Sequence, residues 1–199
     1  MIDEPFRQWL ARRWSAPAVA LHRAGITANQ VSVVAAVLGL TAAALVAVQL
    51  PVFGIVLWLV SRLLDGYDGM LARLAASASL YGGYLDITLD MLAYSAMAIA
   101  FAIAMPADVV LWMVVLLGYV LAITTTLALS SLAERANRTL EGNRSIQFTR
   151  ALAEGGETTA VYVVIALAPS VSRYVLVVWI ALLSITAIQR TALARRLLS

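Results

Sequence analysis

Cysteine and lysine are both absent from this chain of 199 residues, and charged residues of any kind are scarce. Without cysteine the protein has no disulfide, no thiolate metal site and no cysteine nucleophile. Only 13% of the residues are charged, whereas 62% are hydrophobic, and soluble domains are typically about 45–50% apolar. The composition therefore predicts an integral membrane protein, and the length suits one domain over 1–199.

The positive charge of the chain comes from arginine alone, with a formal net charge of +3. These arginines are dispersed along the sequence, a pattern that favours anionic lipid headgroups and argues against a nucleic-acid partner. All of them except Arg173 fall towards the same side of the helices expected below. The positive-inside rule makes that side cytoplasmic and places both termini there. We expect a bacterial cytoplasmic (inner) membrane.

Six stretches approach the roughly 20 apolar residues that a membrane-spanning helix needs. Short turns that contain proline, a helix breaker, separate them in pairs. We therefore expect an all-α fold with six transmembrane helices over 28–195. Residues 1–24 are expected to form an amphipathic helix in the membrane interface and a lead-in, which either frames the cytoplasmic entrance or is a plain anchor. The expected spans are about Asn29–Leu50, Val52–Ala76, Leu80–Met105, Asp108–Leu132, Ala151–Ala168 and Tyr174–Leu193.

Four aspartates stand in the otherwise apolar stretch of the second and third expected helices. Asp65 and Asp68 are three residues apart, and Asp86 and Asp90 are four apart, so each pair shares one helix face. A short turn around 77–79 makes the two helices antiparallel neighbours. The four carboxylates can therefore converge on one point near the cytoplasmic side.

These carboxylates need compensation, because one aspartate at mid-membrane costs about 2.5–3.5 kcal/mol on insertion scales. Arg62 and Arg73 flank the acids but cannot neutralise all four, which disfavours a purely structural salt-bridge cluster. Hard divalent cations are the natural partners of clustered carboxylates. With a phosphate-bearing ligand, the four would suit a pair of Mg²⁺ or Mn²⁺ ions about 3.5–4 Å apart.

Glycines and further residues complete a longer pattern around the four aspartates. The pattern resembles the full signature of the CDP-alcohol phosphatidyltransferase family. This resemblance implies an enzyme that cleaves the pyrophosphate of a CDP-linked donor, usually CDP-diacylglycerol, transfers the phosphoryl-bearing half to an alcohol and releases CMP. It also implies a homodimer. The pattern reads Asp65-x-x-Asp68-Gly69-x-x-Ala72-Arg73 and, after eight residues, Gly82-x-x-x-Asp86-x-x-x-Asp90.

The resemblance also assigns roles to individual residues. Asp90 would be the general base that accepts the proton of the acceptor hydroxyl. Asn29 belongs to a segment, ITANQVS, that resembles the family's entry segment, although Ala28 and Ser32 replace its proline and threonine; Asn29 would alternatively cap the helix. Two divalent cations would be held by Asp65, Asp68 and Asp86, with Asp90 completing the site, and the CDP moiety would be contacted by Asn29, Gly69, Arg73 and Ser79.

The sequence does not identify the acceptor alcohol. Glu154 and Glu157 share a face of the fifth expected helix near the cytoplasm, where they either line the acceptor pocket or pair with Arg150 or Arg144. Glycerol 3-phosphate, inositol phosphate and serine all remain open as acceptors. A divalent-cation transporter and a non-catalytic membrane protein are the alternative functions. A transporter needs polar residues along a path to the far side, and outer segments such as MAIAFAIAM offer almost none.

Overall fold

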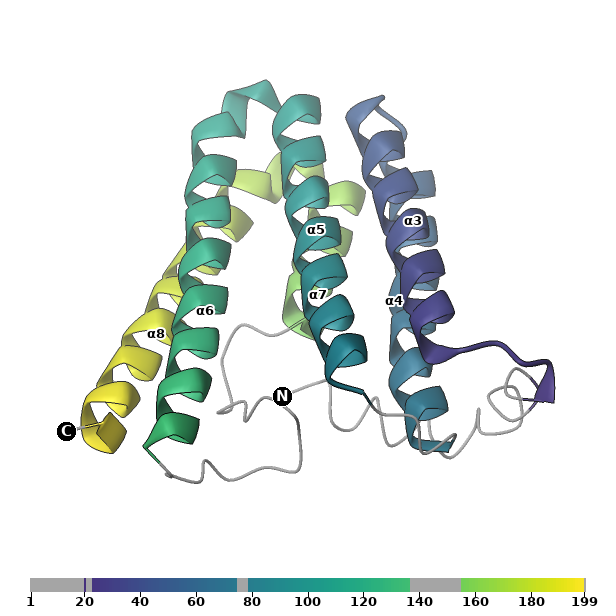
Figure 1. Ribbon diagram of the computed structural model, residues 1–199. Coiled ribbons are helices and arrows are strands. Elements are labelled where there is room, and N and C mark those ends of the chain that lie inside the picture. The colour runs from purple at the N-terminus through teal and green to yellow at the C-terminus, as the bar shows by residue number, and fades with distance from the viewer. Residues whose placement is uncertain (1–19, 21–22, 75–78, 137–154, 199) are drawn as a thin grey trace. The chain divides into compact units, whose positions relative to one another are not determined.

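The computed structural model describes residues 20, 23–74, 79–136 and 155–198, without the side chains of residues 73 and 74. The secondary-structure elements of the described residues are helices, and no strand occurs among them (Figure 1). They divide into two compact units, Ile2–Ala107 and Asp108–Ser199, and each unit is described by itself. The helices are α3 (Ala28–Ala47), α4 (Pro51–Leu74) and α5 (Leu80–Ala104) in the first unit, and α6 (Val109–Arg135), α7 (Gly155–Leu167) and α8 (Ser172–Leu198) in the second.

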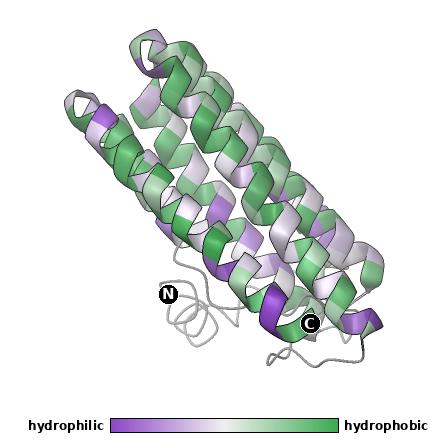
Figure 2. Cartoon of the chain, turned by 90° about the vertical axis from the view of Figure 1, so that its left-hand side faces the viewer, coloured by the Kyte–Doolittle hydropathy of each residue, from purple (hydrophilic) through white to green (hydrophobic). Residues whose placement is uncertain are grey.

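The all-α membrane fold expected from the sequence is confirmed. Four described helical segments are long and apolar enough to cross a membrane: α3, α5, Pro106–Arg135 and Pro169–Leu198. Hydrophobic residues occupy most of the length of the helices (Figure 2). The count of six spans stays a prediction, because α4 has charged residue types, Arg62, Asp65, Asp68 and Arg73, in its second half and the described part of α7 has only 13 residues. The interfacial helix expected over 1–24 lies almost wholly outside the described residues, and the single domain also stays a prediction.

In the first unit, α3 packs against both α4 and α5. A glycine makes this close approach possible: a Cβ on Gly39 would lie 3.1 Å from Oγ of Ser61 on α4 and 3.2 Å from Cβ of Ala93 on α5. Small residues let helix backbones approach each other closely in membranes. The rings of Trp58 and Tyr94, 5.0 Å apart edge to face, connect α4 directly with α5. This packing fixes the rotation of the helices that bear the aspartates.

Two hydroxyl caps set where α3 and α5 begin. The Oγ1 of Thr27 accepts from the backbone N–H of Gln30, whose side chain accepts from the N–H of Thr27, a capping box that satisfies two free donors. At α5, Oγ of Ser79 accepts from the backbone N–H of Gly82. The start of α5 at this cap determines on which successive turns Asp86 and Asp90 fall.

In the second unit, α8 packs against α6 and α7. Three buried aromatic side chains of this unit are joined by hydrogen bonds. The hydroxyls of Tyr119 and Tyr162 lie 2.9 Å apart, and Nε1 of Trp179 donates to the hydroxyl of Tyr119 at 3.4 Å. Near the start of the unit, the buried Asp108 accepts from Oγ of Ser172 at 2.6 Å and from Nε of Arg173 at 3.2 Å. Buried polar groups require such partners, so these contacts explain how the unit tolerates them.

Candidate active site

Three of the four aspartates come together in the first unit. One carboxylate oxygen from each of Asp65, Asp68 and Asp86 lies within 4.8 Å of the other two. Asp65 and Asp68 come from α4 and Asp86 from α5, as their spacing on two neighbouring helices predicts. Asp68 is buried and Asp86 is exposed, so the group opens to the outside on the α5 side.

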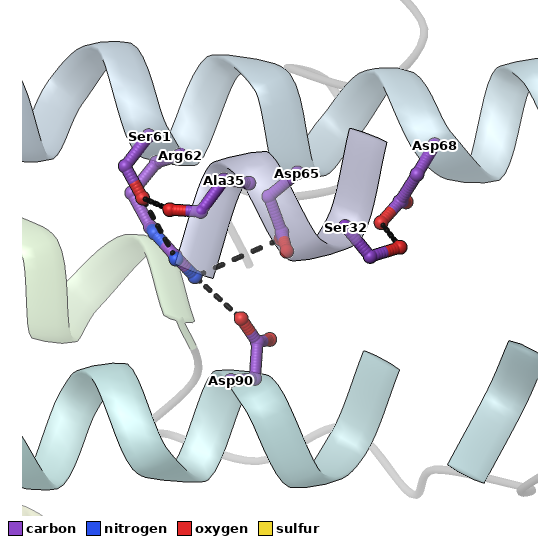
Figure 3. A network of polar contacts seen from close by, with 7 residues as sticks. All are labelled: Ser32, Ala35, Ser61, Arg62, Asp65, Asp68 and Asp90. Atoms are coloured by element: carbon purple, nitrogen blue, oxygen red, sulfur yellow. Dashed lines mark hydrogen bonds and ion pairs between the residues drawn. The ribbon is translucent and has the colours of Figure 1, made fainter. Parts of the chain in front are cut away.

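The buried aspartate of this group is fixed from the first helix. Oγ of Ser32 on α3 donates a hydrogen bond of 2.5 Å to Oδ2 of Asp68, and the two side chains point towards each other in Figure 3. The backbone carbonyl oxygen of Ala28 lies 3.1 Å from the same hydroxyl, whose single proton is directed to the shorter contact with Asp68. A carboxylate that accepts a hydrogen bond on one oxygen has its orientation restricted, which prepares the other oxygen for a ligand.

The fourth aspartate has a different partner. Oδ1 of Asp90 accepts from NH1 of Arg62 at 2.5 Å, and Oδ2 of Asp65 lies 3.7 Å from the same nitrogen. Figure 3 shows the Arg62 side chain reaching from α4 towards Asp90 on α5, with Asp65 on the adjoining turn. Arg62 thus links the group of three carboxylates to Asp90, which itself is not part of that group.

The donor set fits a hard divalent cation. Oxygen atoms of carboxylates are the ligands that Mg²⁺ and related ions prefer, and three of them converge here from two helices. Near the group, the described side chains offer one cation, Arg62, against the four acids Asp65, Asp68, Asp86 and Asp90. A single arginine leaves most of this negative charge uncompensated, so the residues present favour cation binding.

Two of the residues expected to contact the nucleotide, Asn29 and Ser79, lie close to Gly82, which is one helical turn before Asp86 on α5. A Cβ on Gly82 would lie 3.1 Å from Oδ1 of Asn29 and 3.2 Å from Oγ of Ser79, so a glycine on α5 makes room for both side chains. Asn29 does not cap α3, because Thr27 does, so the capping alternative for Asn29 is wrong.

The other expected contacts are placed less completely. Gly69 is partly buried on α4, one residue after Asp68. Arg73 lies near the end of α4, and its side chain is outside the part of the chain that the structure describes. Glu157 is partly buried in the first turn of α7. Glu154, Arg144 and Arg150 lie outside the described residues.

Sequence reasoning missed two residues of the site. In the sequence, Ser32 only replaces the threonine of the entry segment, and Arg62 only offers a compensating charge. A signal for Ser32 was available, since a hydroxyl in an apolar helix must find a partner. The sequence does not show that this partner is Asp68, because Ser32 and Asp68 belong to different helices and are 36 residues apart.

Comparisons with known proteins agree with the site. The model of the CDP-alcohol phosphatidyltransferase family matches residues 25–194. The chain is 32% identical over 155 residues to the inner membrane protein YnjF of Escherichia coli (strain K12), which covers 75% of this chain and 74% of that protein. It is 46% identical over 65 residues to the bifunctional IPC transferase and DIPP synthase of Thermococcus kodakarensis, which covers 33% of this chain and 15% of that protein.

Solved structures share the fold. The phosphatidylinositol phosphate synthase PgsA1 of Mycobacterium tuberculosis, in complex with manganese and citrate, matches with a TM-score of 0.71 at 18% identity, over 90% of this chain and 87% of that chain. The same protein with CDP-DAG bound matches with a TM-score of 0.63 at 18% identity, over 94% of each chain. Because the family model spans both compact units and the aspartates stand in the expected pattern, the chain belongs to the CDP-alcohol phosphatidyltransferase family and is an enzyme of that class.

Proposed function

We propose that the protein transfers a phosphatidyl group from CDP-diacylglycerol to a small alcohol and releases CMP, with two Mg²⁺ or Mn²⁺ ions at the aspartate site. The observation that supports this proposal is the convergence of Asp65, Asp68 and Asp86 within 4.8 Å. A family member of the same fold binds manganese and, in another structure, CDP-DAG. An anionic pyrophosphate donor and a cluster of carboxylates can share one site only through cations.

The aspartates of the site have two functions in this reaction, cation binding and proton transfer. Asp65, Asp68 and Asp86 hold the cations, whose charge, when they are bound, stabilises the attacking and departing oxygens of the transferred phosphate. Asp90 uses its second oxygen, Oδ2, to accept the proton of the acceptor hydroxyl, because Oδ1 is already bonded to Arg62. An alcohol is a poor nucleophile at neutral pH, so a positioned carboxylate accelerates its attack. Asp90 would also complete the cation site, as the family resemblance implies.

Asn29 and Ser79 would bind the CDP moiety from the two sides of Gly82, with Gly69 and Arg73 on α4 as further contacts. Gly82 keeps the space between α3 and α5 narrow and free of a side chain. The lipid tails of the donor would stay in the bilayer, since the site lies on membrane helices, and the head would enter from the cytoplasmic side. A homodimer and an acceptor bound near Glu154 and Glu157 complete the proposal.

A purified-protein assay tests the proposed reaction. The protein in detergent or lipid nanodiscs is given CDP-diacylglycerol, Mg²⁺ or Mn²⁺ and, one at a time, glycerol 3-phosphate, inositol phosphate, serine and further alcohols. CMP release that depends on both the metal and one alcohol is expected, and the alcohol that supports it is the acceptor. Metal-independent release, or no release with any CDP-linked donor, would contradict the proposal.

The role of Asp90 has its own test, the change Asp90→Asn. We expect transfer to fall by about 10²–10⁴-fold, the usual contribution of general-base catalysis, while binding of the CDP-lipid persists. Glu134→Gln is the matched control, because it also exchanges a carboxylate for an amide but lies exposed at the end of α6. Normal turnover of Asp90→Asn would show that another group accepts the proton.

A further inference from the structure

The two long helices of the second unit begin and end together. At their start, the buried Asp108 accepts from Oγ of Ser172 at 2.6 Å and from Nε of Arg173 at 3.2 Å, which joins the first turns of α6 and α8. Both helices have 27 residues, contact each other and finish at the same end of the unit (Figure 1). Because they start at one level and are equally long, their last turns also lie at one level.

This length exceeds what a bilayer needs. A helix of 27 residues is about 40 Å long, whereas the hydrocarbon core of a bilayer is about 30 Å thick. The usual tilt of about 20° shortens the crossing by only about 2 Å. The ion pair of Asp108 and Arg173 belongs at the interface, because charged side chains are costly in hydrocarbon. Counted from that pair, roughly the last seven residues of each helix extend into the opposite headgroup layer.

Arginines occupy the parts of the two helices that extend beyond the hydrocarbon. Arg135 ends α6, Arg195 and Arg196 lie in the last turn of α8, and all three residues are exposed. Within 129–135 and 192–198, Glu134 is the one acidic residue. Three positive charges against one negative charge give this end of the unit a positive surface.

The last turns of α6 and α8 remain packed against each other. Leu129 and Ala133 of α6 are buried, and three partly buried residues of α8 pack against them: Leu193, Ala194 and Leu197. The arginines are therefore carried by a packed pair of helices, which fixes their level and their spacing.

Apolar side chains lie on the membrane side of these arginines. On α6, Leu132 is 47% exposed and precedes Arg135 by three residues; on α8, Ile188 is 67% exposed and precedes Arg195 by seven. Residues three or seven apart share a helix face, so each face presents an apolar group first and a guanidinium after it. A phospholipid offers the matching order, an acyl chain followed by a phosphate. An acidic protein or a nucleic acid would match only the charge.

We propose that Arg135, Arg195 and Arg196 form a binding surface for anionic phospholipids of the bilayer, and that binding stabilises the second unit. A guanidinium donates two parallel hydrogen bonds to a phosphate group. An anionic lipid is favoured over a zwitterionic one, because a zwitterionic headgroup carries its own cation beside the phosphate. This inference goes beyond the proposed transfer reaction and does not depend on it.

The test compares the unchanged protein with the triple variant Arg135→Gln, Arg195→Gln and Arg196→Gln. Each purified protein, in a nonionic detergent, is titrated with phosphatidylglycerol and separately with phosphatidylcholine. The melting temperature gives the apparent affinity, and native mass spectrometry counts the lipids that stay bound. Arg173→Gln is the matched control, because it also removes an arginine whose side chain is 65% exposed, but at the other end of the same unit.

We expect phosphatidylglycerol, and not phosphatidylcholine, to raise the melting temperature of the unchanged protein. The apparent affinity for phosphatidylglycerol should fall about fivefold for each arginine removed and about 100-fold in the triple variant. Arg173→Gln should keep the full affinity, and Glu134→Gln should raise it, because that change removes the negative charge beside the arginines. An increase in salt from about 0.1 M to about 1 M should weaken binding to the unchanged protein but not to the triple variant.

Several outcomes would overturn this inference. Equal affinities of the unchanged protein and the triple variant would exclude the arginines, and equal effects of the two lipids would exclude recognition of charge. Equal binding of glycerophosphoglycerol, the same headgroup without acyl chains, would indicate a site for free phosphates. No binding of phosphatidylglycerol would leave the surface to an acidic protein.

Asp68→Asn separates this surface from the aspartate site. The affinity for phosphatidylglycerol should be unchanged in this variant, whatever its effect on CMP release. Loss of lipid binding in Asp68→Asn would place the lipid at the aspartates and refute the arginine surface, while the proposed reaction would stand. If the triple variant does not fold, Arg135→Gln and Glu134→Gln provide the same comparison, with a decrease expected in the first and an increase in the second.

Discussion

Ser32 and Asp68, on α3 and α4, are joined by a buried hydrogen bond of 2.5 Å between Oγ and Oδ2. This contact restrains the most deeply buried of the three clustered carboxylates from a helix that contributes no aspartate itself. Supporting hydrogen bonds of this kind restrict the orientation of a ligating carboxylate, and their loss typically lowers metal affinity by about 10–100-fold.

The first prediction follows from that contact. Ser32→Ala should weaken Mn²⁺ binding by about tenfold or more, because Asp68 then loses the donor that orients it. Titration of the purified variant with Mn²⁺, followed by electron paramagnetic resonance, measures the change. Ser184→Ala serves as the control, since that hydroxyl donates only to a carbonyl of its own helix, from Ser184 to Ile180. Equal affinities in the two variants would refute the orienting role of Ser32.

The second prediction concerns the clustered carboxylates. Asp68→Asn should lower CMP release by about 10³-fold or more, since the loss of cation binding removes several kcal/mol of transition-state stabilisation and each 1.36 kcal/mol is a factor of ten. Mn²⁺ titration and the CMP assay together check this result. Glu134→Gln, far from the site in sequence and exposed, should behave like the unchanged protein. A variant that binds Mn²⁺ normally would exclude Asp68 as a ligand.

Removal of the metal gives the third prediction. Treatment with EDTA should abolish CMP release, and excess Mg²⁺ or Mn²⁺ should restore it, because the clustered carboxylates and the donor pyrophosphate repel each other without cations. Binding of CDP-diacylglycerol should fall in parallel and return with the metal. The assay is repeated with a metal-free blank and with the chelator saturated by Ca²⁺ before addition. Turnover that survives complete chelation would exclude the proposed metal dependence.

The fourth prediction uses two adjacent glycines of α5. A Cβ on Gly82 would lie 3.1 Å from Oδ1 of Asn29, whereas a Cβ on Gly83 would meet nothing within 4 Å. Gly82→Ala should therefore displace Asn29 and raise KM for CDP-diacylglycerol with little change in kcat. Gly83→Ala is the matched control and should leave both constants unchanged, with helix stability raised by roughly 0.5–1 kcal/mol. Steady-state kinetics decide the outcome, and an unchanged KM in Gly82→Ala would argue against a role of Asn29 in donor binding.

The fifth prediction concerns the packing of α3 on α4. A Cβ on Gly54 would lie 2.6 Å from Cγ2 of Val46 and 2.8 Å from the backbone oxygen of Ala42. Since the backbone cannot move aside as a side chain can, Gly54→Ala should destabilise the protein by about 1–3 kcal/mol, the usual cost of overpacking. Thermal unfolding in one detergent, with Gly83→Ala as the reference, measures the difference. A melting temperature equal to that of Gly83→Ala would show that the two helices separate easily.

Several features of this protein follow from the sequence because they depend on local periodicity and composition. The helix positions were predicted to within a few residues: the third expected span, Leu80–Met105, is observed as Leu80–Ala104. The pairing of aspartates on helix faces is equally local, because residues three and four apart lie on the same side of any α-helix. The family resemblance needed no more than the spacing of these residues.

Tertiary structure alone decided which groups surround the aspartates. The spacing predicts that Asp90 lies near the other three, and only the structure shows that its Oδ1 accepts a hydrogen bond from Arg62, 28 residues away. The contact of Arg62 with the ring of Tyr94 and the hydrogen bond from Ser32 to Asp68 likewise join residues of different helices. Periodicity gives the directions of side chains around one helix axis but not the rotation of that helix against its neighbours. That rotation is set by close contacts of small residues such as Gly39, and the partners of each carboxylate follow from it.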